Sequence, residues 1–115
     1  MKDFMLIFIG KDYAEMGLSP EQMQERMGKW FAWNSQMQEQ GVVKDGHALH
    51  PQVRHISGSE RTVTDRTLAE LKEVVGGYYV VSAKNLEGAC EIAQGYPDYD
   101  LGGTVEVREI VVFDN

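Results

Sequence analysis

The chain has 115 residues, 43 % of them hydrophobic and 25 % charged, a composition typical of one globular domain with a modest core. The net charge of −7 argues against nucleic-acid binding, because a phosphate backbone needs a surface rich in lysine and arginine. The longest apolar run, residues 4–9, is too short to span a membrane, and a single cysteine excludes an intrachain disulfide. We therefore expect one cytoplasmic domain over residues 1–115 that binds neither nucleic acid nor membrane.

The first part of the chain predicts a strand followed by a long helix. Residues 4–9 lack polar alternation, which predicts a strand buried on both faces. Ser19-Pro20-Glu21-Gln22 matches a helix start with a capping box, and Gly41 is a typical stop after a helix that ends near Gln40. Side chains at spacings of three and four predict a core-facing stripe on this helix, with a ligand-binding surface as the less favoured alternative: Met23, Met27, Trp30, Phe31, Asn34 and Met37.

The middle of the chain predicts short strands and a hairpin. We expect one strand on each side of a bend at Pro51, then a turn at residues 58–60. Residues 61–64 are expected to pair back across that turn. A short helix is predicted over residues 68–75, and the aromatic run that follows predicts a strand over residues 77–82.

The last part of the chain predicts a second helix and a closing strand. Asn85 is a typical N-cap, and Gly95 a typical stop for the helix between them. Its predicted apolar stripe, Leu86, Ala89, Cys90 and Ala93, makes Cys90 an inert buried thiol. Residues 104–113 predict the final strand.

This order of elements predicts an α+β fold. It matches a ferredoxin-like antiparallel sheet with helices on one face and an inserted hairpin and short helix. One helical layer leaves the other face of the sheet uncovered, although apolar strand residues are too many for one layer to bury: Val80, Val105, Val107, Val111 and Val112. We therefore expect a homodimer in which a second copy covers that face.

Four segments are specific in combination. They are the Ser-Pro-Glu helix start at 19–21, the Gly-x-x-Leu-x-Pro segment at 46–51, the run from Thr64 to Tyr79 that ends in Gly-Gly-Tyr-Tyr, and the closing strand at 103–108. Together they resemble the YCII-related family, in particular its DGPF-domain branch, over nearly the whole chain. The resemblance implies a dimeric α+β barrel, with two sheets packed face to face. Where that branch has Asp-Gly-Pro-Phe, this chain has Asp65-Arg66-Thr67-Leu68 and lacks the turn-forming glycine and proline.

The catalytic candidates are Asp65, His47 and His50. The resemblance implies a site with a histidine and aspartate pair, which makes Asp65 a candidate base or histidine orienter. Its alternative role is to cap the short helix that follows it. On a regular strand, His47 and His50 point to opposite sides, which disfavours a shared metal ion. We expect no metal and no cofactor.

The substrate-binding candidates are Glu106, Arg108 and Tyr79. Glu106 and Arg108 alternate with valines on the closing strand, so both lie on the face opposite the helices if the valines face them. There Arg108 could hold a carboxylate of a substrate, and the alternative is an ion pair at the interface or in solvent. One tyrosine hydroxyl, that of Tyr79, is a candidate to reach the cleft.

Two functions of different classes remain open, beside a third interpretation in which the altered segment at residues 65–68 marks a degenerate member of the family kept only for assembly. The first is binding of a small organic molecule in a cleft between helices and sheet or at the dimer interface, with metal-free acid–base catalysis as an extension of it. The second is a non-catalytic interaction or regulatory module, which the resemblance implies because relatives often occur alongside sigma factors of the extracytoplasmic-function type. An enclosed pocket favours the first, and an exposed apolar patch favours the second.

Overall fold

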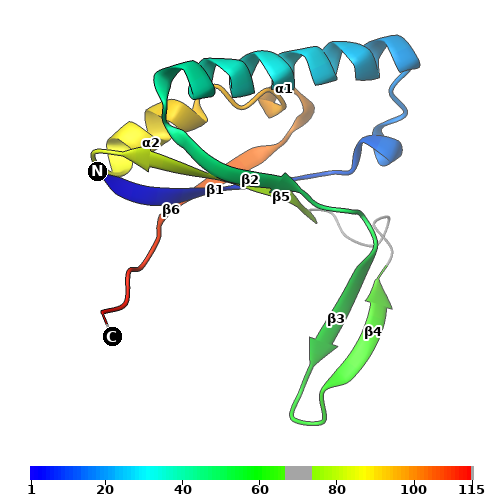
Figure 1. Ribbon diagram of the computed structural model, residues 1–115. Helices are drawn as coiled ribbons and strands as arrows, with labels where there is room; N and C mark the ends of the chain where they lie inside the picture. The colour runs from blue at the N-terminus through cyan, green and yellow to red at the C-terminus, as the bar shows by residue number, and fades with distance from the viewer. Residues whose placement is uncertain (67–73, 115) are drawn as a thin grey trace.

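The computed structural model describes residues 1–66 and 74–114, and Figure 1 shows a sheet with helices on one side of it. Four strands make the sheet in the order β2-β5-β1-β6, and all neighbours are antiparallel. Their bounds are Lys2–Gly10 for β1, Val43–Ala48 for β2, Val74–Ala83 for β5 and Thr104–Glu109 for β6. This is the predicted α+β, ferredoxin-like arrangement.

Local capping signals set the ends of the helices. In α1 (Pro20–Gln40) the Ser19 hydroxyl accepts the Gln22 N–H at 3.1 Å, and the Gln22 side chain accepts the Ser19 N–H at 2.9 Å. Gly41 follows with a φ of 70°, which favours glycine. In α2 (Leu86–Ala93) the Asn85 side chain accepts the Gly88 N–H at 2.9 Å, and the helix ends slightly before Gly95.

Two short 3-10 helices, η1 (Tyr13–Met16) and η3 (Tyr99–Leu101), lie in the loops after β1 and α2. Among the helices of residues 1–66 and 74–114, none combines the length and apolar character needed to cross a membrane.

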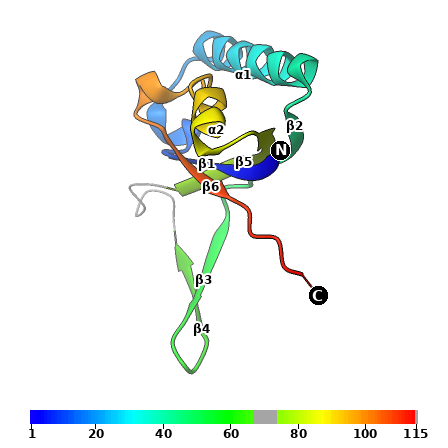
Figure 2. The ribbon, with the colours of Figure 1, turned by 90° about the vertical axis from the view of Figure 1, so that its left-hand side faces the viewer.

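The core lies between the helices and the sheet. On β1 the buried residues Phe4, Leu6 and Phe8 alternate with half-buried residues such as Met5 and Ile7. Within one copy, β1 is therefore buried on one face only, and not on both faces as predicted. Both helices lie on the same face (Figures 1 and 2), and no described helix covers the other, which we call the open face.

The core-facing sides of the helices also differ from the prediction. On α1 Trp33 and Met37 are buried, whereas Met27 is 42 % and Phe31 65 % exposed. The N-terminal half of α1 lies over the cavity described below, so its apolar side chains line a wall instead of filling the core. On α2 the buried positions are Ala89 and Ala93. Cys90, one step of about 100° further round that helix, is exposed and not the buried thiol predicted.

The predicted hairpin is formed by β3 (Val53–Ser57) and β4 (Thr62–Arg66), which make a separate two-stranded sheet. It projects from the open face of the main sheet, away from the helices (Figures 1 and 2). The predicted short helix at 68–75 falls mostly outside the described residues. Its last two positions, Val74 and Val75, begin β5 instead.

The closing strand is shorter than predicted. β6 ends at Glu109, which pairs with Phe4, and the next N–H, that of Ile110, donates to the Asp3 carbonyl at 2.9 Å. Because β1 itself begins at Lys2, little of its backbone remains to pair with residues further along. Val111, Val112 and Phe113 are therefore left 69, 82 and 80 % exposed, outside the sheet.

Candidate functional site

A cavity of about 770 Å³ opens between the N-terminal half of α1 and the ends of β1, β2 and β5. This volume lies in the range that accommodates a drug-sized organic ligand. Most of its walls are apolar or aromatic, contributed by Phe8, Trp30, Phe31, Leu49, Tyr79 and Tyr96 among others. Four elements, one helix and three strands, thus surround one space on the helix side of the sheet.

The inner wall is a cluster of aromatic rings around Phe8. Its ring lies 5.2 Å from Trp30 and 5.5 Å from Tyr79 in edge-to-face geometry. It stacks on Tyr96 at 5.2 Å with an interplanar angle of 16°. Trp33 meets the same ring at 5.8 Å. Such mutually packed rings have few alternative rotamers, so they present a preformed surface to a ligand.

A buried carboxylate, Asp98, lines the same cavity. Only 6 % of Asp98 is exposed, and its Oδ2 accepts a hydrogen bond from the Tyr13 hydroxyl. Trp30 Nε1–H donates to the Tyr13 hydroxyl at 2.9 Å and to Asp98 Oδ2 at 3.3 Å. Burial, reinforced by the bond to Asp98, raises the pKa of Tyr13 above its usual value. Tyr13 therefore stays protonated near neutral pH and acts as a donor.

Arg26 of α1 holds the loop that carries this carboxylate. Its guanidinium binds Asp100 in bidentate fashion at 2.6 and 2.5 Å and donates to the Pro97 carbonyl at 3.1 Å. The hydrogen bonds from Arg26 to the Asp100 carboxylate lower the pKa of Asp100 to about 2. Arg26 Nη1 also lies 3.5 Å from Asp98 Oδ1, an ion-pair distance, but that buried oxygen accepts no hydrogen bond within the described residues. The loop is thus fixed to α1 at the edge of the cavity.

Three of the residues singled out from the sequence line the cavity, namely His47, His50 and Tyr79. His47 Nε2 lies 3.4 Å from Asp45 Oδ1, and both side chains are more than half exposed. The argument that the two histidines face opposite sides assumed one regular strand. β2 ends at Ala48, so that periodicity does not extend to His50. Burial raises the pKa of Tyr79 in the wall.

The other three lie away from the cavity. Asp65 is inside β4, where its Oδ1 is 2.7 Å from Arg54 Nε and its side chain is 77 % exposed, so it occupies a strand and not a helix cap. Glu106 and Arg108 pair with Ile7 and Met5 on the open face, while Val105 and Val107 pack against the core. The closing strand therefore has the predicted facing, on the far side of the sheet from the cavity.

Sequence reasoning missed the cluster of Tyr13, Arg26, Trp30 and Asp98. Arg26 and Trp30 are four residues apart on α1, a spacing that places them on one side of a helix. That spacing was the available signal. No local pattern links Asp98 to Tyr13 or to α1, because these contacts join residues separated by more than half the chain. Tyr13 lies 17 residues before Trp30, in a different element, so helical spacing does not link these two either. Within the described residues, no group of three or more His, Cys, Asp or Glu side chains is arranged to hold a metal ion.

Comparison with models of protein families gives a match over most of the chain. A family model described as "YCII-related domain" matches residues 4–114 of the chain, which is almost all of it. No curated protein matches the chain. The sequence resemblance to this family is thereby confirmed.

Proposed function

The chain belongs to the YCII-related family, and from that premise we propose that it binds a small, planar organic molecule in the cavity between α1 and the sheet. The observation that carries this proposal is the cavity of about 770 Å³ with its preformed aromatic wall. A cavity of this size, mostly apolar with a few polar groups, is the usual form of a small-molecule site.

The lining defines the chemistry of the ligand. Trp30 and Phe31 offer ring faces, and Phe31 and Leu49 are 65 and 49 % exposed, so a bound apolar surface would remove them from water. Such burial stabilises a complex by about 25 cal/mol per Å² of apolar area. His47, His50 and the Asn34 amide are among the polar groups of this lining, beside the Asp98 carboxylate described above. A fused or substituted aromatic ring that carries a hydroxyl or amine fits this lining.

Titration with 2-naphthol, a planar aromatic alcohol, tests this proposal. The chain has two tryptophans, so a nitrogen-15 NMR spectrum contains two indole N–H signals, which a Trp33→Phe variant assigns. We expect the Trp30 signal to shift with saturation, because this residue lines the cavity. Ala48→Trp should abolish the shift by filling the cavity. Ala14→Trp, at an exposed position outside the lining, should leave it unchanged. An unchanged Trp30 signal, or equal shifts in both variants, would contradict the proposal.

Acid–base catalysis is a second candidate function. It is favoured by His47, which lines the cavity and has the Asp45 carboxylate 3.4 Å from its Nε2. Imidazole is the side chain most often used for proton transfer near neutral pH, and a carboxylate beside it can orient the ring. This pairing assigns the orienting role to Asp45 instead of Asp65.

Elimination of nitrobenzisoxazole tests for such a base with a flat aromatic probe. A base removes the carbon-bound proton of the probe, the N–O bond breaks, and the coloured cyanophenolate forms without any other reactant. We expect His47→Asn to lower the rate about tenfold or more. His55→Asn serves as the control, because His55 lies on the hairpin outside the cavity lining. Equal rates in both variants would exclude His47 as the base.

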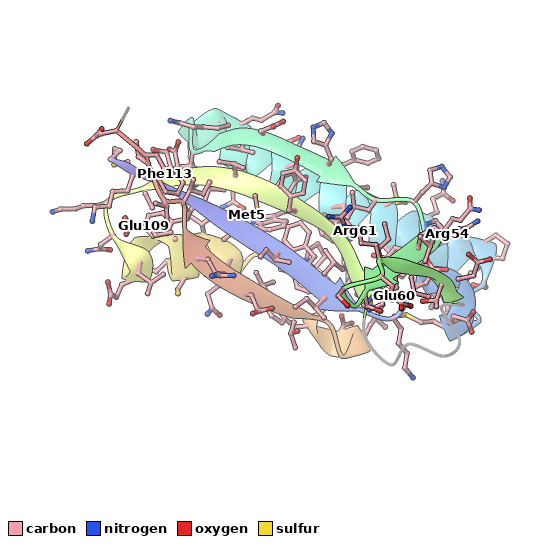
Figure 3. The ribbon with its side chains drawn as sticks, turned by 90° about the horizontal axis from the view of Figure 1, so that it is seen from below. Met5, Arg54, Glu60, Arg61, Glu109 and Phe113 are labelled. Atoms are coloured by element: carbon pink, nitrogen blue, oxygen red, sulfur yellow. The ribbon has the colours of Figure 1, made fainter. Side chains whose placement is uncertain are left out.

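We further propose that the protein is a homodimer, with the open faces of two copies in contact. The support is a strip of half-exposed apolar residues along the two central strands, which includes Met5, Ile7 and Val80. In Figure 3, which looks onto the open face, Met5 lies near the middle of the sheet. A two-fold axis would bring this strip against itself, as an isologous interface requires. A species of 13.0 kDa in solution at micromolar concentration would contradict the homodimer.

A further inference from the structure

The hairpin (β3–β4) and the C-terminal segment (residues 110–114) extend from the main body with apolar side chains exposed. We propose that, in the homodimer, the hairpin of each copy packs against the C-terminal segment of the other. This inference rests on the homodimer proposed above and adds to it the residues that hold the two copies in register.

The two most exposed apolar side chains of the hairpin share one of its faces, whereas Val53 lies on the other face, where it pairs with Arg66 and lines the cavity. Ile56 and Val63 form a cross-strand pair and are 64 and 58 % exposed. The neighbouring pair on the same face is Arg54 with Asp65, joined at 2.7 Å. The opposite face carries polar pairs, His55 with Thr64 and Ser57 with Thr62. An isolated two-stranded hairpin is at best marginally stable in water, so this amphipathic hairpin needs a surface for its apolar face.

The C-terminal segment also exposes apolar side chains, which could pack against those of the hairpin. Val111, Val112 and Phe113 are consecutive apolar residues, each at least 69 % exposed. Both projections leave on the open-face side of the sheet, and they do so at opposite ends of it (Figures 1 and 3). A second copy seated on the open face would therefore lie between them.

Two-fold symmetry decides which projections meet. An axis along the strands would bring the two hairpins to the same end of the paired sheets, where they would overlap sterically. An axis across the strands exchanges the ends, so the hairpin of one copy reaches the C-terminal segment of the other, and the reverse contact follows by symmetry. Only the second arrangement gives each apolar projection an apolar partner.

Charge favours the same arrangement. The hairpin sequence carries three arginines and two acidic residues, although the whole chain has a net charge of −7. The C-terminal segment and the strand end before it carry Glu109 and Asp114. Contact between two hairpins would bring like charges together, whereas contact between a hairpin and a C-terminal segment pairs opposite ones.

Sedimentation equilibrium on variants at exposed positions tests the contact. We expect Ile56→Ser with Val63→Ser, or Val112→Ser with Phe113→Ser, to weaken the homodimer about 100-fold, because each pair removes two buried apolar side chains. The matched control, His55→Ser with Thr64→Ser on the other face of the hairpin, should keep the wild-type dissociation constant. Since the two sets of residues are in contact in the proposed homodimer, a variant that carries all four substitutions should lose less free energy of association than the two double variants lose in sum.

Disulfide trapping tests the pairing directly in a Cys90→Ser background. A mixture of the Val63→Cys and Phe113→Cys proteins should form mainly the mixed disulfide, whose mass differs from those of the two symmetric products. When Thr64→Cys replaces Val63→Cys in the mixture, much less of the mixed disulfide should form, because Thr64 lies on the other face of the hairpin. If wild type dimerises but the apolar variants match the control, or if trapping joins hairpin to hairpin, the inference is wrong and the open-face homodimer stands. If wild type is a monomer, both are wrong.

Discussion

Replacing Phe8 with alanine is expected to lower the free energy of unfolding by about 3–5 kcal/mol, the usual cost of removing a buried aromatic ring. Phe8 is 7 % exposed and its ring packs against Trp30, Trp33, Tyr79 and Tyr96. The loss has two parts. The first is the favourable free energy of burying the phenyl ring, which alanine lacks, and the second is the cost of the empty space left among the neighbouring rings, which cannot move to fill it. Urea unfolding followed by circular dichroism measures the change.

Phe31→Ala is the matched control. It removes the same side chain from a position that is 65 % exposed at the cavity wall, so we expect a loss below about 1 kcal/mol. The comparison also separates stability from binding, because Phe31 contacts the ligand space but supports little of the core. A loss of less than about 1 kcal/mol for Phe8→Ala as well would mean that the aromatic cluster is not packed as described.

Replacing Asp98 with alanine is expected to cost about 2–4 kcal/mol of stability, although it removes a charge. The substitution leaves the half-buried Tyr13 hydroxyl without its acceptor and removes one acceptor from the Trp30 indole. It also removes the carboxylate that lies 3.5 Å from the Arg26 guanidinium. Arg26 retains its hydrogen bonds to Asp100 and to the Pro97 carbonyl. Thermal and urea unfolding give the change in free energy.

Asp98→Asn separates the hydrogen bonds from the charge. An amide oxygen can still accept from Tyr13, so we expect a smaller loss of stability than with alanine. Part of the rise in the pKa of Tyr13 comes from Asp98, after the larger effect of burial. Carbon-13 NMR of the tyrosine rings, with the Tyr13 signal assigned by a Tyr13→Phe variant, should therefore show the pKa of Tyr13 lower in the asparagine variant than in wild type. Asp100→Asn, which alters the exposed partner of Arg26, should leave that pKa nearly unchanged. Equal tyrosine titrations in wild type and Asp98→Asn would contradict the assigned contact.

Features that short segments determine were predictable from the sequence. The capping box at Ser19, the stop at Gly41 and the cap at Asn85 each depend on contacts within a few residues, and all three are present. The hairpin after Pro51 follows from local turn chemistry in the same way. Together with the order of elements, these signals were enough to give the α+β class and the sheet with helices on one side.

Features that depend on distant segments were not predictable. Whether Phe31 or Trp33 faces the core depends on where the cavity lies under α1, and periodicity along α1 says nothing of that. The end of β6 is set by the start of β1, since strand pairing needs a partner. The meeting of Tyr13 with Asp98 joins the loop after β1 to the loop after α2. Three of the residues named as candidates from the sequence, His47, His50 and Tyr79, line the cavity, but the polar cluster beside them was not predictable.

A crystal structure grown with 2-naphthol tests the proposed binding site most directly. The account predicts density for the compound inside the cavity, against the Trp30 and Tyr79 rings, with its hydroxyl within hydrogen-bond distance of one of the polar lining groups. An empty cavity with the compound bound on the open face, or at no ordered position at a saturating concentration, would contradict it.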